Sequence, residues 1–231
     1  RDVLGSRGLG DVYKRQTSLT FPDRITRIGN NVCYDCTGIE SLTLPAALKE
    51  IGDYAFAYNS KLTGVTLPEG LETLGLRAFM SCAALKQAVL PATIKKMDNY
   101  AFYGCGLETI ALPDGVDTIG TNVFQSCRSL VSAKLPATLK AVPDYMFSSC
   151  PALTTVSNME NITEIGASAF EGCTSLKTDI PSGVTDLGTS AFKNCKAIET
   201  ITIPSAIKSI PNSLLSGCTA LKLSLIHISE P

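Results

Sequence analysis

The sequence predicts a solenoid, in which short units of one design stack into a single array with a parallel β-sheet along one side. Proline recurs at steps of 23, 23, 23, 22, 23, 45 and 23 residues, and the step of 45 holds two units, with Met159 at the missing proline position. Phenylalanine and cysteine recur with the same spacing. Self-similarity with a fixed period of about 20 to 50 residues indicates a stacked array. The recurring prolines are Pro22, Pro45, Pro68, Pro91, Pro113, Pro136, Pro181 and Pro204.

The repeats extend over residues 17–223, which we expect to form one domain of about nine repeats. Each unit of a solenoid contacts only its neighbours, so the core is continuous. Hydrophobic residues make up 45% of the chain and charged residues 18%, which is typical of a folded protein with a large core. The net charge of −1 lacks the basic excess that nucleic-acid binding requires, and no apolar run reaches the roughly 18 residues of a membrane span. We therefore expect neither a nucleic-acid partner nor insertion into a membrane.

Both ends of the sequence depart from the repeat pattern. Residues 1–16 and 224–231 lack the repeat spacing and resemble translated sequencing-adapter read-through, so we expect them to be non-native and exclude them from the fold. The alternative is that they are genuine but divergent caps, because a solenoid needs polar caps over its terminal core layers. On the first interpretation the chain is a fragment of a longer repeat protein.

The first segment of each repeat, such as residues 41–44, alternates polar and apolar side chains, which predicts a strand with one buried face. Proline follows at its end, where it removes no interior ladder hydrogen bond. The next segment, such as residues 48–52, has two apolar residues three apart, which predicts a short turn or bridge on the opposite side of the coil. At residues 177–180 the strand has lost one residue, and we expect a bulge or kink there.

The third segment is predicted to be a helical turn that follows a glycine or proline and contains the pair Ala-Phe. In seven of nine repeats the residue after the glycine or proline has a side chain that favours an N-cap. The phenylalanines share one position and should stack into a buried column, with burial worth about 1.5 to 3 kcal/mol for each ring. They are Phe56, Phe79, Phe102, Phe124, Phe147, Phe170 and Phe192. Cys33 and Leu215 take this position in the first and last repeats.

These features together resemble the BspA-like leucine-rich-repeat family. The opening L-x-x-L-x-L is the strand signature of leucine-rich repeats, and the length of 22 to 23 residues, the proline after the strand and the ending A-F-x-x-C resemble the BspA-like type. The resemblance covers about residues 18–223, although the asparagine column of commoner leucine-rich repeats is missing. It implies a right-handed α/β-type horseshoe or arc, with a parallel sheet on the concave face and short turns and helical turns on the other side.

Eight of the nine cysteines occupy one repeat position, and Asn59 takes that position in the remaining repeat. Stacked strands lie about 4.8 Å apart, whereas the Cβ atoms of a disulfide lie about 3.8 Å apart. We therefore favour a ladder of buried thiols that act as small hydrophobes, with scattered disulfides as the alternative. Cys33 and Cys36 form a C-x-x-C, but zinc needs two further ligands, and we expect no metal. The eight are Cys36, Cys82, Cys105, Cys127, Cys150, Cys173, Cys195 and Cys218.

Side chains suited to catalysis are scarce. His227, the one histidine, lies in the divergent C-terminal end, so Ser-His-Asp and Cys-His sites are not expected in the repeats. Asp179 lies in the shortened strand, where a bulge residue is a better interpretation than a catalyst. Gly8 and Gly10 lie in the excluded segment with no helix pattern after them, so they do not predict a phosphate-binding loop. We expect no enzyme activity and no cofactor.

The predicted concave face is the candidate partner site, because solenoids use that face for binding. Its outward side chains form a flat, nearly uncharged surface of threonine and serine. One interpretation is purely structural, since threonine suits a half-exposed strand. The other is a broad protein-contact face with little charge selectivity. The candidate contact residues are Thr43, Thr66, Gln87, Thr109, Ser132, Lys134, Thr155, Thr178, Thr200 and Thr202.

Six tyrosines belong to the predicted helical turns. Exposed tyrosines anchor many protein interfaces, but half-buried packing beside the phenylalanine column is the interpretation that we favour from the sequence. They are Tyr34, Tyr54, Tyr58, Tyr100, Tyr103 and Tyr145.

The family resemblance implies a cell-surface or secreted bacterial adhesin, or a relative in parasitic protists, that contacts host or neighbouring-cell proteins. Fold alone does not establish function, so two alternatives stay open. The repeats could be a substrate-docking or targeting arm of a larger enzyme, or a spacer that holds another domain away from a cell wall. The sequence leaves the ligand and the oligomeric state open.

Overall fold

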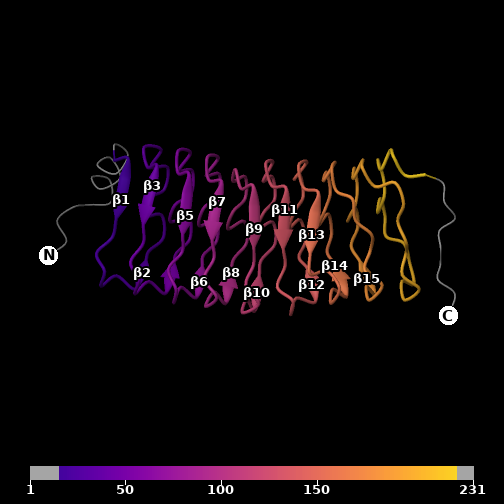
Figure 1. Cartoon of the computed structure of the whole chain (residues 1–231), viewed down its shortest axis with the longest axis horizontal. Helices are drawn as coiled ribbons and strands as arrows, with labels where there is room; N and C mark the ends of the chain where they lie inside the picture. Colours follow the sequence, from indigo (N-terminus) through magenta and orange to yellow (C-terminus); the bar gives the residue numbers. More distant parts are fainter. Residues whose placement is uncertain (1–15, 223–231) are drawn as a thin grey trace.

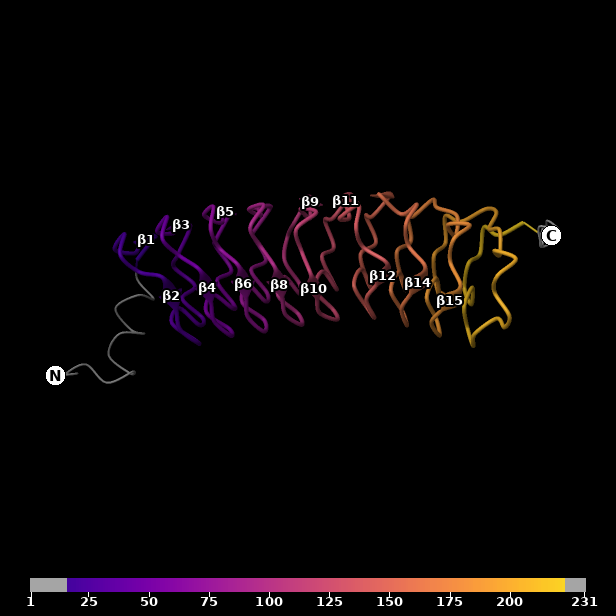
Figure 2. The same cartoon turned by 90° about the horizontal axis from the view of Figure 1, so that it is seen from below.

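The computed structural model describes residues 16–222, which form a stack of similar coils (Figure 1). Three-residue strands lie along one side of the stack, two-residue strands along a second side, and turns along a third. The stack is elongated and follows a shallow arc (Figure 2). The segments that we predicted to be non-native lie outside the described residues, apart from Gln16, and so do Gly8, Gly10 and His227.

The three-residue strands form the side that we call the strand face. Most successive strands pair in parallel, one repeat apart, so that Leu19 lies opposite Leu42 and Ala133 lies opposite Val156. The central residue of each strand points into the core and its neighbours point outward, as the alternation predicts. The strands are β1 (Ser18–Thr20), β3 (Ser41–Thr43), β5 (Gly64–Thr66), β7 (Gln87–Val89), β9 (Thr109–Ala111), β11 (Ser132–Lys134) and β13 (Thr155–Ser157).

The second side is a further parallel ladder, where the sequence predicted only a short turn or bridge. Ile28 lies opposite Ile51, and Leu74 opposite Met97, again one repeat apart. Each strand has only two residues, so no alternation could reveal it. The strands are β2 (Arg27–Ile28), β4 (Glu50–Ile51), β6 (Thr73–Leu74), β8 (Lys96–Met97), β10 (Thr118–Ile119), β12 (Ala141–Val142), β14 (Glu164–Ile165) and β15 (Asp186–Leu187).

The third side, which we call the turn side, contains no helix within residues 16–222, so the predicted helical turns do not form. Two residues of each turn have a left-handed backbone, for example Tyr54 (φ 54°) and Tyr58 (φ 64°), and a right-handed helix requires negative φ throughout. The N–H groups of Tyr54, Phe56 and Tyr58 donate to carbonyl groups of the next coil at 2.7–2.8 Å. These donors therefore bond between coils instead of within one.

The predicted N-cap side chains also have different partners. Asp53 Oδ1 accepts the backbone N–H of Leu76, in the next coil, at 2.9 Å. Leu76, which holds the position of Asp53 in its own coil, has no side-chain acceptor for the following coil. In that following coil Asp98 replaces the usual glycine, and its Oδ1 accepts the N–H of Asn99 at 2.8 Å. The side chains that suit an N-cap thus satisfy donors of a neighbouring coil. Asn30, Asn99 and Asp144 make bonds equivalent to that of Asp53.

The residue before these side chains is glycine in most coils, with Asp98 and Pro143 among the exceptions, and at several of the glycines the coils approach too closely for a Cβ. A Cβ added to Gly75 would lie 2.6 Å from the carbonyl carbon of Gly52 and 2.8 Å from the nitrogen of Asp53. Gly29 holds the same repeat position in the first coil, and there the nearest atom would be Val32 Cγ2 at 3.8 Å. At Gly75 the requirement for glycine therefore comes from the close approach of the preceding coil.

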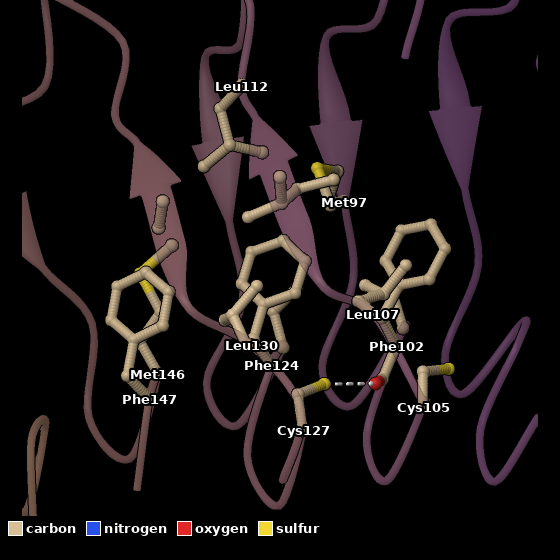
Figure 3. Close-up of a cluster of buried hydrophobic side chains, with 14 of the residues drawn as sticks. Met97, Phe102, Cys105, Leu107, Leu112, Phe124, Cys127, Leu130, Met146 and Phe147 are labelled. Carbon is tan, nitrogen blue, oxygen red and sulfur yellow. Dashed lines mark hydrogen bonds between the residues drawn. The ribbon is translucent and has the colours of Figure 1, made fainter. Parts of the chain in front are cut away.

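The phenylalanines form the predicted continuous column inside the stack (Figure 3). Neighbouring rings from Phe56 to Phe192 are stacked, with centroids 5.3–5.9 Å apart and interplanar angles of 5–18°. Each of these rings is at most 1% exposed. Because seven successive coils each add a ring to the same column, the core is continuous along that part of the array.

The cysteines line the same interior, and none of the nine is in a disulfide. Each thiol from Cys82 onward donates to the carbonyl of the phenylalanine in the preceding coil, with Sγ–O distances of 3.0–3.2 Å, such as Cys127 to Phe102 in Figure 3. In its coil Asn59 takes the place of the cysteine as hydrogen-bond donor. Its Nδ2 donates to the carbonyls of Cys33 and Phe56 at 2.9 and 2.7 Å. The ladder of buried thiols is therefore confirmed, with a hydrogen-bonding role that the sequence did not predict.

Burial raises the pKa of seven of these thiols, those of Cys33, Cys105, Cys127, Cys150, Cys173, Cys195 and Cys218. Removal from solvent is the main cause, and it raises the pKa of Cys33 and of Cys127 to about 12. Burial also raises the pKa of Cys150 and Cys173 well above the ordinary value, with an added contribution from the neighbouring thiol of the column. A thiolate is the form that attacks electrophiles and binds metals, so burial disfavours the reactive form of these thiols.

The raised thiol pKa values predict that the array loses stability at alkaline pH. Above pH of about 8.5, thiols of the unfolded chain lose protons while those of the folded chain keep them. The free energy of unfolding should then fall by up to about 1.4 kcal/mol per pH unit for each buried thiol. Urea unfolding from pH 7.5 to 10 measures how steeply the free energy of unfolding falls with pH. Cys150→Ala should make this slope shallower by the contribution of one thiol. An identical slope in that variant would contradict the assignment.

The glycine position offers a paired test of coil stacking. Gly75→Ala should lower the free energy of unfolding by about 1–3 kcal/mol, the usual range for overpacking, because backbone atoms must move to admit the methyl group. Gly29→Ala places the same methyl group in the same repeat position without a close neighbour and should change stability much less. Urea denaturation of both variants measures the difference, and equal losses would show that stacking is not the cause.

Candidate functional site

The strand face presents most of the predicted contact residues to solvent. Eight of the ten are exposed, and Ser132 and Thr178 are half-buried. For the seven that belong to strands, from Thr43 to Thr155, the paired strands fix their positions, because the buried central residue of each strand forces its two neighbours outward. Thr178, Thr200 and Thr202 lie beyond the last three-residue strand, and the contact of all ten with a partner remains a prediction.

Shallow hollows interrupt this face where the ladder breaks. The strands do not pair between β3 and β5 or between β7 and β9, and the row ends after β13. A hollow of about 290 Å³ lies between β7 and β9, with Gln87, Val89 and Thr109 among its lining residues. Val89 is 56% exposed, which makes this the apolar part of an otherwise polar face. The step of 22 residues between Pro91 and Pro113 coincides with this break, whereas the break between β3 and β5 falls in an ordinary step of 23 residues.

The shortened segment at residues 177–180 has no strand, so the predicted irregularity is present. Asp179 Oδ1 accepts the N–H groups of Ile180 at 2.9 Å and of Thr202, in the next coil, at 2.7 Å. The carboxylate therefore takes the place of a ladder carbonyl, which agrees with the structural interpretation of this residue. A hollow of about 310 Å³ lies beside it, lined in part by Lys177 and Glu199.

Charged side chains near the strand face pair with opposite charges in the neighbouring coil. Lys86 Nζ lies 3.1 Å from Glu108 Oε1, and Lys222 Nζ lies 2.7 Å from Glu199 Oε2. The hydrogen bond from Lys222 is the main cause that lowers the pKa of Glu199. Such exposed pairs add little stability, but they leave the face without a field that would steer a highly charged ligand.

The part of the chain that the structure describes offers no evident site for metal or covalent chemistry. No group of three or more histidine, cysteine, aspartate or glutamate side chains lies close enough there to hold a metal ion. Cys33 of the C-x-x-C pair is 1% exposed and lies in the phenylalanine column. The same residues include no helix with the length and hydrophobicity needed to cross a bilayer.

Four of the six turn-side tyrosines are half-buried, as expected, and two are more exposed. Their ring contacts join them to one another, as in the pairs Tyr34–Tyr58 and Tyr100–Tyr103. Tyr34 and Tyr145 are 44% and 40% exposed, and the other four are half-buried. Sequence reasoning missed Arg77, which lies between two of these rings.

Comparisons with known proteins agree with this architecture. The crystal structure of a leucine rich repeat protein from T. pallidum is 25% identical, with a TM-score of 0.63 over 80% of this chain and 78% of that one. A leucine-rich repeat protein from Eubacterium ventriosum is 24% identical, with a TM-score of 0.67 over 92% of this chain and 68% of that one, and shows the fold. A leucine rich cell surface protein from Faecalibacterium prausnitzii is 28% identical, with a TM-score of 0.46 over 89% and 78%.

A search of curated proteins finds no match. The family model described as the BspA type leucine rich repeat region matches residues 13–108 and 95–222, with 6 copies. Together the two matches cover most of the chain, including every coil described above. The chain therefore belongs to the BspA-type leucine-rich-repeat family.

Proposed function

We propose that this chain is a non-catalytic protein-binding module of a cell-surface or secreted protein, and that the partner contacts its strand face. The observation that carries the proposal is the row of exposed, mostly small side chains along the strand face, held in register within three groups of paired strands. Extended solenoid surfaces suit broad contacts with other macromolecules. The location and the host or neighbouring-cell partner follow from the resemblance to BspA-like proteins.

The character of the face supports a protein partner over a small molecule. Its hollows are shallow and open, whereas small-molecule sites are concave and enclose most of the ligand. The exposed Val89 lies in a hollow whose lining also includes Ala111, with the polar Gln87 and Thr109 beside it. An apolar centre with a polar rim is the usual composition of a protein interface.

Lysine substitutions on two faces test this proposal. Thr66→Lys and Thr109→Lys place a charge in the proposed contact surface and should raise the Kd by about tenfold or more, because a charge left unpaired in an interface costs several kcal/mol. Thr118→Lys makes the same change on the side of the two-residue strands and should leave the Kd unchanged. Surface plasmon resonance against fibronectin, laminin and collagen measures all three.

Two results would argue against the proposal. Unchanged binding of both strand-face variants would remove this face from the contact. If no extracellular-matrix or cell-surface protein binds the unmodified chain, the spacer alternative is favoured.

A further inference from the structure

Bulky side chains occupy an unfavourable backbone position on the turn side of the N-terminal coils. The first left-handed residue of the turn is Tyr54 (φ 54°), Arg77 (φ 55°) and Tyr100 (φ 59°) in three successive coils. Bulky residues rarely adopt positive φ, whereas asparagine tolerates it. Tyr145 (φ 57°) occupies this position in one other coil, and the remaining five coils use small polar residues. Those residues are Asn31, Asn122, Ser168, Ser190 and Ser213.

Arg77 is held between the two tyrosines but has no carboxylate partner. Its guanidinium carbon lies 5.4 Å from the centroid of the Tyr54 ring and 4.8 Å from that of Tyr100. Its Nη1 donates to the hydroxyl of Tyr54, and its Nε is buried without a hydrogen-bond partner. The ion pairs formed within residues 16–222 all involve other side chains. The guanidinium is therefore oriented by aromatic faces while its charge is not neutralised.

Further tyrosines extend this arrangement over neighbouring coils. Tyr34 lies 6.3 Å from Tyr54 and 5.3 Å from Tyr58, between ring centroids, and Tyr100 lies 5.7 Å from Tyr103. Tyr34 remains 44% exposed. We call this group the tyrosine–arginine cluster. Its members are Tyr34, Tyr54, Tyr58, Arg77, Tyr100 and Tyr103.

Fold stability does not account for the cluster. The same turn forms with serine or asparagine in other coils, where the backbone is left-handed without a bulky side chain. The phenylalanine column already fills the interior behind it, with Phe56, Phe79 and Phe102 at most 1% exposed. Backbone strain that the fold does not need is concentrated in proteins at ligand-contacting positions.

We propose that the tyrosine–arginine cluster is a second contact surface, which anchors a protein partner through a carboxylate bound by Arg77. Tyrosine and arginine are the residue types that dominate the energy of protein interfaces. A planar guanidinium that is already oriented binds a carboxylate through two hydrogen bonds with little further loss of freedom. The unneutralised charge selects an aspartate or glutamate side chain of the partner. This inference rests on the proposed protein-binding function and adds a surface to the strand face.

Two displayed peptide libraries of one design test the inference, one with aspartate or glutamate at its central position and the other with asparagine or glutamine. We expect binders only from the acidic library. Arg77→Gln and Tyr100→Asn should weaken the selected peptides by at least about tenfold, as for interface hot spots. Tyr145→Asn is the matched control, because Tyr145 has the same left-handed backbone (φ 57°) outside the cluster. It should leave binding unchanged.

Thermal unfolding separates binding from a structural role. Tyr100→Asn should keep or raise the Tm, because asparagine relieves the backbone strain. A Tm that falls in Arg77→Gln and Tyr100→Asn, with binding lost in proportion, would overturn the inference. Equal enrichment from both libraries, or none from either, would also overturn it. So would binding of heparin in place of peptides, because the partner would then be a polyanionic glycan.

Failure of this inference can be distinguished from failure of the strand-face proposal. Selected peptides that lose affinity with Thr66→Lys but not with Arg77→Gln would overturn the inference and support the strand face. Peptides that lose affinity with Arg77→Gln but not with Thr66→Lys would support the inference. A chain that binds neither peptides nor matrix proteins would refute both surfaces.

Discussion

Backbone hydrogen bonding between successive coils is the interaction on which the rest of this structure depends. Buried N–H and carbonyl groups need partners, and here the partners lie one repeat away on all three sides of the coil. On the turn side this arrangement requires two left-handed residues in each turn, and it brings coils so close at Gly75 that no Cβ fits. The nearly constant repeat length is the consequence, because an extra residue would move every donor away from its acceptor.

The same spacing determines the chemistry of the interior. Like residues lie over like, so one phenylalanine in each repeat becomes a stacked column and one cysteine in each repeat becomes a row of thiols. The thiols donate to phenylalanine carbonyls and are removed from solvent, which keeps them protonated. Asn59 shows that the position requires a donor, since the amide replaces the thiol by bonding the same kind of carbonyl. Cysteine here serves folding and not reactivity.

A regular array has many equivalent surfaces, so its specificity must come from departures from the repeat. Here these departures are the breaks in the strand row, with the exposed Val89 at one and Asp179 at another, and the bulky residues around Arg77 on the turn side. Each departure leaves coil stacking intact, because the backbone bonds of the neighbouring coils continue past it. The fold can therefore tolerate local specialisation on its surface.

The sequence by itself determined the repeat, the strand face, the buried phenylalanine and thiol columns, and the irregularity near Asp179. Each of these follows from the spacing of recurring residues or from the alternation of polar and apolar side chains along the chain. The short motifs, by contrast, were weak predictors of chemistry. The glycines Gly8 and Gly10 did not predict a phosphate-binding loop, and the C-x-x-C of Cys33 and Cys36 did not predict a metal site. Only the tertiary structure decided that the turns are not helical, that Asp53 and Asn99 bond the next coil, and that Arg77 lies between two tyrosines. These features depend on contacts between residues about one repeat apart, and local propensity does not contain them, since the same side chains would also suit a helix N-terminus.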